Sequence, residues 1–488
     1  MSGGGMEPTD TPAPAPAATE AHDEHEGVYD PRTSFRVDTS PRNIGAALRE
    51  YVGRLRSGDP GGLPSVLGLV VLGVIFASTT SDFLSRNNVA NLPGQASFIA
   101  LIALGLVFVL LVGEIDLSAG TTAGMCAAFA AQSLNSGDLH KGAGSVVYIA
   151  LIIGMIGAIG IGVANRMWTA PGIVLIGLVC LLTGLSNHHQ PMAFLLAISI
   201  GVAVGMFAGV LVARLGIPSF IVTLALFLSW EGVELYALKN QSIGTTNYSI
   251  WFGLTHDNMA LWAGWLFYAV LAGGYLIFTL VRSRLRRQAG LSSDTLALVL
   301  GRAGVIVVLG AVVVWFLSQN RSFNSNIKIE GVPWAASVPI TFMVFWTLVL
   351  SKTTWGRHLY AIGGNAEAAR RAGIPVERVK ISAFAICSGM AAVGGLFLAD
   401  FSGGATTGLG QGDILLFAVA AAVIGGTSLF GGRGKPRDAL IGALVIATIP
   451  NGIHLHNFPE QANEVITGLV LLVAAAVDAI SRRRAKAG

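Results

Sequence analysis

The chain has 488 residues, of which 53% are hydrophobic and 12% are charged, and its formal net charge is +4. Soluble domains carry roughly 25% charged residues, so this composition excludes an ordinary water-soluble protein and indicates one that is solvated by lipid. Basic residues lie beside apolar runs rather than in a patch interleaved with aromatic side chains, which argues against nucleic-acid binding. Cys126, Cys180 and Cys387 lie singly within apolar runs, so neither a disulfide framework nor a zinc site is predicted.

The first sixty residues differ in composition from everything that follows. Residues 1–27 are rich in proline, alanine and acidic residues, have too few apolar side chains to fold, and lack a signal-peptide pattern. Residues 32–56 are basic and mildly amphipathic, which suits a segment lying against a membrane. We therefore predict a disordered cytoplasmic tail over 1–60, a membrane domain over 61–481 and a basic cytoplasmic tail over 482–488.

Apolar runs recur along the membrane domain, and each is about 17–25 residues long, enough to cross a bilayer core of ~30 Å. We expect an all-α integral membrane bundle of about 12–14 spans, some of them broken helices. The candidate crossings are 63–81, 96–113, 115–132, 146–164, 169–186, 193–213, 217–237, 260–281, 295–317, 335–351, 382–399, 411–430, 438–453 and 463–480. Gly201, Gly205 and Gly209 form a GxxxGxxxG face, which favours tight packing within one bundle over a contact between subunits.

Counting the crossings predicts the orientation of the chain. With the N-terminus in the cytoplasm, the basic cluster from Arg282, the long polar loop over 352–380, the Gly431–Asp438 loop and the C-terminal tail all fall inside. The opposite loops are poor in lysine and arginine, as the positive-inside rule requires. The sequence thus predicts a multi-pass protein of the inner membrane with both termini in the cytoplasm.

Two carboxylates, Glu114 and Asp116, lie between consecutive crossings with almost no loop. Ionised carboxylates at membrane depth are costly and normally face protein or a water-filled cavity. Asp116 could be the N-cap of a new helix, with Ser118 close by, or could line a transport path. Asp116 and Asp413 each open a Gly/Ala-rich apolar stretch, and the span count starts these stretches from opposite sides of the membrane. That pattern is typical of an inverted repeat whose broken helices flank a central path.

The segment Tyr360–Lys380 has the pattern of a short helix in a cytoplasmic loop. Asn365 is a good N-cap, Glu367 suits the first turn, and Gly373 can end the helix in the left-handed conformation. A helix of about two turns is unstable alone in water. It therefore needs a surface to dock on, either its own bundle or a cytoplasmic partner.

Catalytic and nucleotide-binding motifs are not apparent in the sequence. GGRGKP has Leu429 where a Walker A loop has its first glycine and Pro436 where that loop has Ser or Thr. The histidine pairs have no third metal ligand nearby, and no nucleophile is paired with a base. The sequence therefore predicts a protein that is not an enzyme and that binds no metal or other cofactor.

The motifs EIDLSAG, PSFIVTLA, YAIGGNAEAARRAGI and VIGGTSLFGG, with the RRR tail, follow one another between about Asp82 and Arg484. In this combination the chain resembles the permeases of bacterial ABC importers for monosaccharides such as ribose and xylose. The D-xylose and multiple-sugar branch is the most similar, because Glu precedes Ile-Asp-Leu-Ser there. The resemblance implies an ATP-driven importer of xylose or a similar sugar that works by alternating access. Its expected partners are an ABC ATPase that binds ATP and Mg²⁺, an extracytoplasmic sugar-binding protein, a second permease copy and membrane lipid.

The resemblance also implies a group of coupling residues, and the polar residues within the apolar runs indicate a second group along a translocation path. The segment that couples the permease to the ATPase would comprise Gly363, Gly364, Asn365, Glu367, Arg370, Arg371, Gly373 and Ile374. The candidate translocation path comprises Glu114, Asp116, Ser118, Trp230, Glu231 and Asp413.

Three positions depart from the family's usual pattern: Ala208 replaces Asn, Glu231 replaces Arg, and Leu415–Phe417 replaces Glu-Leu-Asp. The transported solute could therefore be another small polar molecule. A secondary transporter driven by an ion gradient remains an alternative, although it would need more membrane-embedded ionisable groups as a relay. A scaffold protein is disfavoured because acid-bearing broken spans are costly without a pathway to line.

Overall fold

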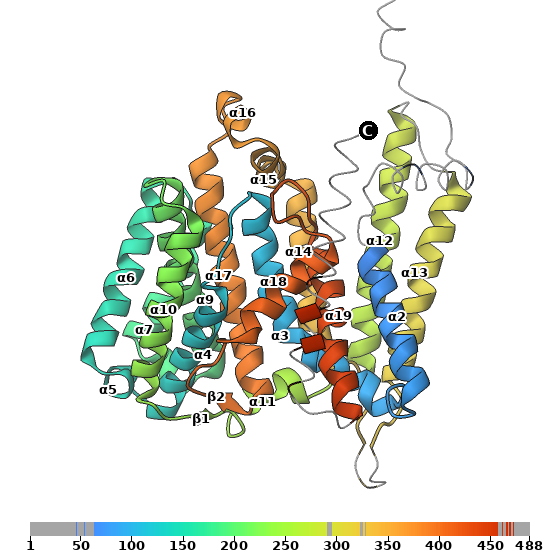
Figure 1. Ribbon diagram of the computed structural model, residues 1–488, viewed down its shortest axis with the longest axis horizontal. Helices are drawn as coiled ribbons and strands as arrows, with labels where there is room; N and C mark the ends of the chain where they lie inside the picture. The colour runs from blue at the N-terminus through green and yellow to red at the C-terminus, as the bar shows by residue number, and fades with distance from the viewer. Residues whose placement is uncertain are drawn as a thin grey trace, which may run out of the picture.

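The computed structural model describes residues 63–289, 295–322, 326 and 328–456, with isolated positions outside these ranges. Over this part of the chain the fold is a helical bundle, and its only strands form a two-residue antiparallel pair, β1 (Ile243–Gly244) with β2 (Gly404–Ala405) (Figure 1). Apart from isolated positions, the expected tails over 1–60 and 482–488 and the expected crossing 463–480 lie outside the described residues. The predicted all-α membrane bundle is confirmed.

A helix stands at each expected crossing that the structure describes. These helices are α2 (Leu63–Thr79), α3 (Arg86–Leu111), α4 (Ala119–Ser136), α6 (Ser145–Ala164), α7 (Thr169–Leu182), α9 (Gln190–Ala213), α10 (Ser219–Leu238), α12 (Leu261–Gln288), α13 (Leu296–Leu317), α14 (Trp334–Lys352), α17 (Val376–Phe401), α18 (Asp413–Gly425) and α19 (Pro436–Leu455). Short helices lie between them: α5 (Leu139–Ala143), α8 (Leu185–His188), α11 (Ser249–His256), α15 (Thr354–Gly364) and α16 (Ala366–Arg371).

Within the described ranges, 9 helices are long and apolar enough to cross a membrane, and three shorter apolar helices accompany them. One of the shorter helices, α18, has 13 residues. At a rise of 1.5 Å per residue it extends about 20 Å, less than a bilayer core of ~30 Å. Helix α18 is therefore too short to cross the bilayer core alone, and its being part of a broken span stays a prediction.

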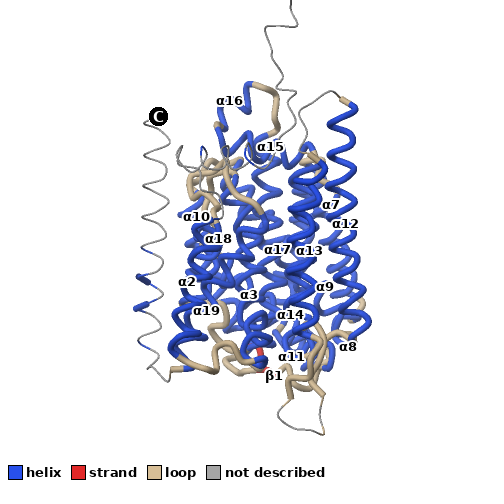
Figure 2. The backbone as a smooth tube through the Cα atoms, turned by 90° about the vertical axis from the view of Figure 1, so that its right-hand side faces the viewer, coloured by secondary structure: helices blue, strands red, loops and turns tan. Residues whose placement is uncertain are grey.

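The two ends of the bundle differ in what they carry. Helices α15 and α16 project from one end, and α5, α11, β1 and β2 lie at the opposite end (Figures 1 and 2). We call these the α16 end and the strand end. Helix α12 finishes at the α16 end with Arg286 and Arg287 in its last turn, and α14 finishes there with Lys352. These basic residues therefore gather at the end that carries α15 and α16, as the span count predicts.

Helix α17 lies at the centre of the bundle and packs against α3, α4 and α9. The glycine face of α9 makes one of these contacts. A Cβ on Gly201 would meet Ser388, one on Gly205 would meet Phe384, and one on Gly209 would meet Ile381, all on α17. The GxxxGxxxG face thus packs within the chain, and the interpretation as an intramolecular contact is confirmed.

The outer helices present apolar side chains outward, as lipid contact requires. Large exposed hydrophobic residues recur on α6, α12 and α13, for example Ile153, Trp262 and Trp315. The α12–α13 hairpin is joined to the bundle near the strand end, where Val314, Leu317 and residues beside them form a small separate hydrophobic cluster with Ala90 of α3. Figure 1 shows this hairpin set to one side of the main bundle.

Several helices extend beyond the apolar runs that predict them. Helix α17 begins at Val376 rather than at residue 382, and α3 begins at Arg86 rather than at residue 96. Ser85 caps α3 by accepting a hydrogen bond from the N–H of Asn88 (3.3 Å), so polar residues form its first turns. Hydropathy marks only the apolar portion of such helices, which explains the misplaced boundaries.

Candidate functional site

The segment 352–380 is mostly helical rather than a polar loop. Helix α15 follows α14 after Thr353, whose hydroxyl accepts a hydrogen bond from the N–H of Gly356 (3.1 Å). Leu359 and Ile362 face the bundle and are buried. The Tyr360 hydroxyl donates a hydrogen bond to the carbonyl of Gly434 (2.7 Å), and burial raises the pKa of this phenol above its usual value. Helix α15 is therefore docked on its own chain.

Gly363 lies where three segments meet. The backbone of α15 approaches the last carbonyl of α3, that of Leu111, and the backbone of Gly432 so closely that a Cβ on Gly363 would collide with both. The N–H of Gly432 donates to the Leu111 carbonyl (3.0 Å). The neighbouring Gly364, in contrast, has nothing within 4 Å of its Cβ position. Gly363 is thus needed for packing, whereas Gly364 faces open space.

Helix α16 has the caps that the sequence predicts. The side chain of Asn365 accepts a hydrogen bond from the N–H of Ala368 (2.9 Å). Gly373 adopts φ +81°, and its N–H donates to the carbonyl of Arg370 while that of Ile374 donates to Ala369. This pair of bonds is a Schellman motif. The helix is therefore a well-defined protrusion at the α16 end.

The charged side chains of α16 point to the surface. Glu367 forms ion pairs with Arg370 (3.4 Å) and Arg371 (3.2 Å), and all three side chains are exposed. Exposed pairs of this kind contribute little to stability, about 0–1 kcal/mol. They are therefore available to contact another protein without loss of the fold.

Glu114 is joined to the start of α17. Its carboxylate forms an ion pair with Lys380, and the two side chains are only 16% and 19% exposed. Gly113, at φ +79°, turns the chain just before it, after the end of α3. Glu114 and the α15–α16 segment thus lie at the same end of the bundle, since Lys380 follows that segment in the chain.

Asp116 is buried, but it is not the N-cap of α4. The N-cap is Ser118, and the helix begins at Ala119. One oxygen of Asp116 accepts hydrogen bonds from the N–H (2.9 Å) and the hydroxyl (2.6 Å) of Ser118. The carboxylate also lies beside the buried Cys387 thiol of α17. The carboxylate therefore holds the turn that precedes α4, and the N-cap lies two residues later than expected.

The starts of α4 and α18 meet inside the bundle. A Cβ on Gly120 would collide with the carbonyl of Gly410 and would lie 3.1 Å from Leu415. Helix α4 runs from the α16 end towards the strand end, and α18 runs the opposite way after β2. Asp413, the first residue of α18, is exposed. The opposite directions agree with the inverted-repeat hypothesis, although Asp116 is buried and Asp413 is not.

Trp230 and Glu231 lie on α10 and are half-buried, whereas Glu234, one turn further on, is fully buried. The Glu234 carboxylate accepts a hydrogen bond from the N–H of Leu409 (2.9 Å) in the segment that leads into α18. That segment ends just before Asp413, the first residue of α18. Among the described residues, Glu114 and Asp116 form their ion pair and hydrogen bonds with Lys380 and Ser118 rather than with Glu234 or Asp413. The translocation candidates therefore form two groups rather than one.

Sequence reasoning did not identify Asp400 as a site residue. This buried carboxylate ends α17 and accepts hydrogen bonds from the N–H (2.9 Å) and the hydroxyl (2.8 Å) of Thr255, with His256 at 3.6 Å. The partners are 145 residues away in sequence, so no local pattern indicates the contact. The sequence feature that could have identified Asp400 is the presence of an acid at the end of an apolar run.

The described residues do not contain a cluster of three or more His, Cys, Asp or Glu side chains able to hold a metal ion. Cys126, Cys180 and Cys387 are buried, free thiols. What the geometry offers is a capped, charged protrusion at one end and buried acids beside broken helices within the bundle. Such an arrangement suits transport with coupling to a partner better than it suits covalent chemistry.

Comparison with known proteins identifies the family. The family model described as "Branched-chain amino acid transport system / permease component" matches residues 88–475. The xylose transport system permease protein of Escherichia coli (strain K12) is 31% identical over 426 residues, which cover 86% of this chain and 92% of that protein. The corresponding protein of Haemophilus influenzae is 30% identical, covering 85% of this chain and 96% of the relative.

A ribose import permease of Haemophilus influenzae is 28% identical, over 85% of this chain and 92% of its own length. No solved structure matches the chain significantly. Together with the apolar helices, these relatives show a multi-pass protein of the inner membrane. The chain therefore belongs to the family of branched-chain amino acid transport system permease components and is a transport subunit rather than an enzyme.

Proposed function

We propose that the chain is the membrane permease of an ATP-driven ABC importer that moves xylose or a similar monosaccharide into the cell. The observation that carries the proposal is the likeness to xylose permeases over 86% of the chain. The ribose permease supports the choice of a small sugar, although at lower identity. The changed positions Ala208, Glu231 and Leu415–Phe417 leave room for a solute other than xylose.

ATP hydrolysis would take place on a separate ATPase chain, because GGRGKP is not a Walker A motif. The coupling segment would be α16 with the end of α15, comprising Gly363 to Ile374. The contacts of α16 support this assignment, in addition to the resemblance to the family. Glu367, Arg370 and Arg371 project from a capped helix whose backbone is fixed by the Schellman motif, so a push on α16 would reach α17 through Ile374 and Pro375. The site would lie on the cytoplasmic side, as the basic residues at the α16 end support.

A second copy of the permease and an extracytoplasmic sugar-binding protein complete the proposed importer. The binding protein would contact the strand end, which lies opposite α16. Rigid-body movement of the two permease copies would expose the path to one side of the membrane and then to the other. In this proposal Glu114, Asp116, Ser118, Trp230, Glu231 and Asp413 lie along or beside the path.

The decisive experiment is uptake of radiolabelled xylose by proteoliposomes that contain the chain with its co-purified ATPase and binding protein. The expected result is uptake that requires ATP and saturates with xylose. Ribose and arabinose serve as competing sugars, and their order of competition identifies the solute. Uptake without the ATPase, driven by a proton or sodium gradient, would replace the proposal with the secondary transporter.

The coupling segment is tested separately by co-purification in mild detergent. The triple variant Glu367→Ala, Arg370→Ala, Arg371→Ala should lose most of the ATPase that wild type retains. The matched control is Asp138→Ala with Lys141→Ala, an exposed ion pair (3.6 Å) on the α5 side at the strand end. Equal recovery of the ATPase with both variants would place the docking surface elsewhere.

A further inference from the structure

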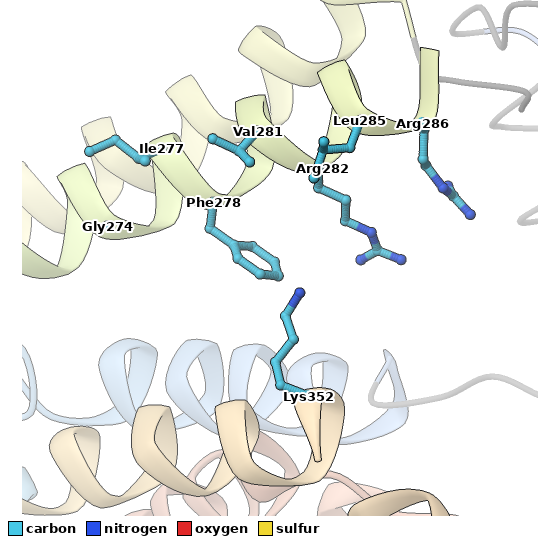
Figure 3. Close-up of a pocket in the computed structure, with 8 residues that line it drawn as sticks. All are labelled: Gly274, Ile277, Phe278, Val281, Arg282, Leu285, Arg286 and Lys352. Carbon is cyan, nitrogen blue, oxygen red and sulfur yellow. The ribbon is translucent and has the colours of Figure 1, made fainter. Parts of the chain in front are cut away.

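An open cleft separates the end of α12 from the end of α14. Its volume is about 530 Å³, and it is lined by Gly274, Ile277, Phe278, Val281, Arg282, Leu285, Arg286 and Lys352. Figure 3 shows Phe278 and Arg282 pointing from α12 toward Lys352 on α14. The cleft arises because the α12–α13 hairpin is held to the bundle near the strand end, as the hydrophobic cluster around Val314 and Leu317 shows.

The lining residues of α12 form a single stripe. They form two adjacent rows with a spacing of four residues, Gly274–Phe278–Arg282–Arg286 and Ile277–Val281–Leu285, which places them on one face of the helix. From Gly274 to Arg286 the stripe rises by about 18 Å, at 1.5 Å per residue. Its lower part is apolar and its upper part is basic. This order matches an amphiphile with its hydrocarbon chain towards the bilayer centre and its charged group at the surface.

The apolar part of the stripe is open to the outside. Ile277 is 64% exposed and Val281 is 49% exposed, although both lie on a helix that is long and apolar enough to cross the membrane. Contact of these apolar side chains with water is unfavourable, whereas an acyl chain covers them without burying any polar group.

The basic part attracts an anion. Arg282, Arg286 and Lys352 bring three positive charges to the cleft, and no acidic side chain is among the described residues that line it. Lys352 is steered towards α12 by a cation–π contact, with its Nζ 4.4 Å from the centroid of the Phe278 ring. Two arginines on one wall and a lysine on the other can bind a phosphate between them, since guanidinium and ammonium groups are the usual phosphate donors.

From this juxtaposition we propose that the cleft between α12 and α14 binds an anionic phospholipid. The headgroup phosphate lies among Arg282, Arg286 and Lys352, and an acyl chain lies along Ile277, Phe278 and Val281. The lipid bridges the two walls, so it links the α12–α13 hairpin to α14 beside the cation–π contact between Phe278 and Lys352. The proposal depends only on the chain crossing a membrane and is independent of the transported solute.

The test is native mass spectrometry of the purified chain in mild detergent with added dioleoylphosphatidylglycerol, dioleoylphosphatidylcholine or inorganic phosphate. Wild type should bind phosphatidylglycerol in clear preference to phosphatidylcholine. The double variant Arg282→Gln, Arg286→Gln should bind phosphatidylglycerol roughly tenfold more weakly or worse, since each basic residue near an anionic surface contributes substantially to attraction. Lys352→Gln, on the opposite wall, should also weaken binding.

The matched control is Arg284→Gln with Arg287→Gln, which removes two charges from the same turns of α12 without changing the lining of the cleft. This control should bind as wild type does. Equal weakening by both double variants would mean diffuse charge attraction and would overturn the site. Equal binding of the two lipids by wild type, or displacement of phosphatidylglycerol by millimolar phosphate, would also overturn it. If the double variant melts early, the Lys352→Gln variant and the wild-type lipid preference decide the question.

Discussion

Lys380, in the second turn of α17, forms an ion pair with Glu114 in the turn that joins α3 to α4. The pair ties the central helix of the bundle to the turn that holds Asp116 and Ser118. Since α17 follows α16 after Pro375, a displacement of α16 would move the start of α17 and, through the ion pair, this turn. On our proposal, the ion pair therefore links the coupling segment mechanically to one group of translocation candidates.

Replacing Glu114 by Ala should lower the apparent melting temperature, because Lys380 would lose its partner in a site that is largely shielded from water. Breaking a shielded pair costs a few kcal/mol, about 2 here because the site keeps some access to water. Replacing Glu367 by Ala, which removes two exposed pairs, should leave the melting temperature unchanged. A double-mutant cycle with Lys380→Met measures the coupling energy. A coupling energy of zero in this cycle would show that the two side chains do not interact.

Gly363→Ala should destabilise the junction of α15, α3 and the Gly432 segment, because the new methyl group would collide with backbone atoms rather than with a movable side chain. The expected cost is about 1–3 kcal/mol, the range for overpacking. Gly364→Ala is the control, since its Cβ position is open. Thermal unfolding monitored by fluorescence compares the two variants. The same melting temperature for both would contradict the close contact at Gly363.

Gly205→Ala should weaken the contact between α9 and α17 for the same reason. Its Cβ would collide with the Phe384 carbonyl and with Ala385. Gly157→Ala, on the outward-facing α6, has open space and should be neutral or slightly stabilising, because Ala favours a helix by up to ~1 kcal/mol over Gly. Proteolysis of the detergent-solubilised variants provides the readout. Faster cleavage of Gly157→Ala than of Gly205→Ala would reverse the expected order.

Glu234→Ala should loosen the segment between β2 and α18. The N–H of Leu409 would lose the carboxylate and keep only the carbonyl of Thr406 (3.2 Å) as acceptor. A reporter variant, Thr406→Cys, should then react faster with a maleimide, and the native cysteines give little background because all three are buried.

Glu234→Gln keeps an acceptor oxygen and should leave the labelling rate near that of the reporter alone. Glu231→Ala, at a half-buried position on the same helix, controls for the loss of a carboxylate. If Glu231→Ala accelerates labelling as much as Glu234→Ala does, the hydrogen bond to Leu409 is not what holds the segment.

Local features of the sequence predicted local features of the structure. Asn365 and Gly373 were recognisable as caps because a cap depends on the neighbouring three or four residues. The apolar runs predicted where helices lie, since length and hydropathy decide membrane crossing. The polar start of α3 and the extension of α12 to Gln288 were missed because the helix continues beyond the apolar core of the bilayer.

Contacts between distant segments could not be predicted in the same way. Glu234 meets Leu409 at a separation of 175 residues, and Thr255 meets Asp400 at 145. The hydropathy of the sequence indicates that such acids lie within the membrane domain, but it does not indicate which residues they bind. Likewise, the glycine stripe on α9 indicated close packing, and only the three-dimensional arrangement identifies α17 as the helix it packs on.

The glycine contacts around α17 have a consequence for how the protein can move. Helices α3, α4 and α9 approach it through backbone atoms at Gly105, Gly395 and Gly205, so at these three points no side chain lies between the helices to take up a displacement. We therefore expect these four helices to move together as one block. Any passage that opens and closes during transport therefore has its moving walls at the margin of that block, along α10 and α18 or between neighbouring copies of the chain.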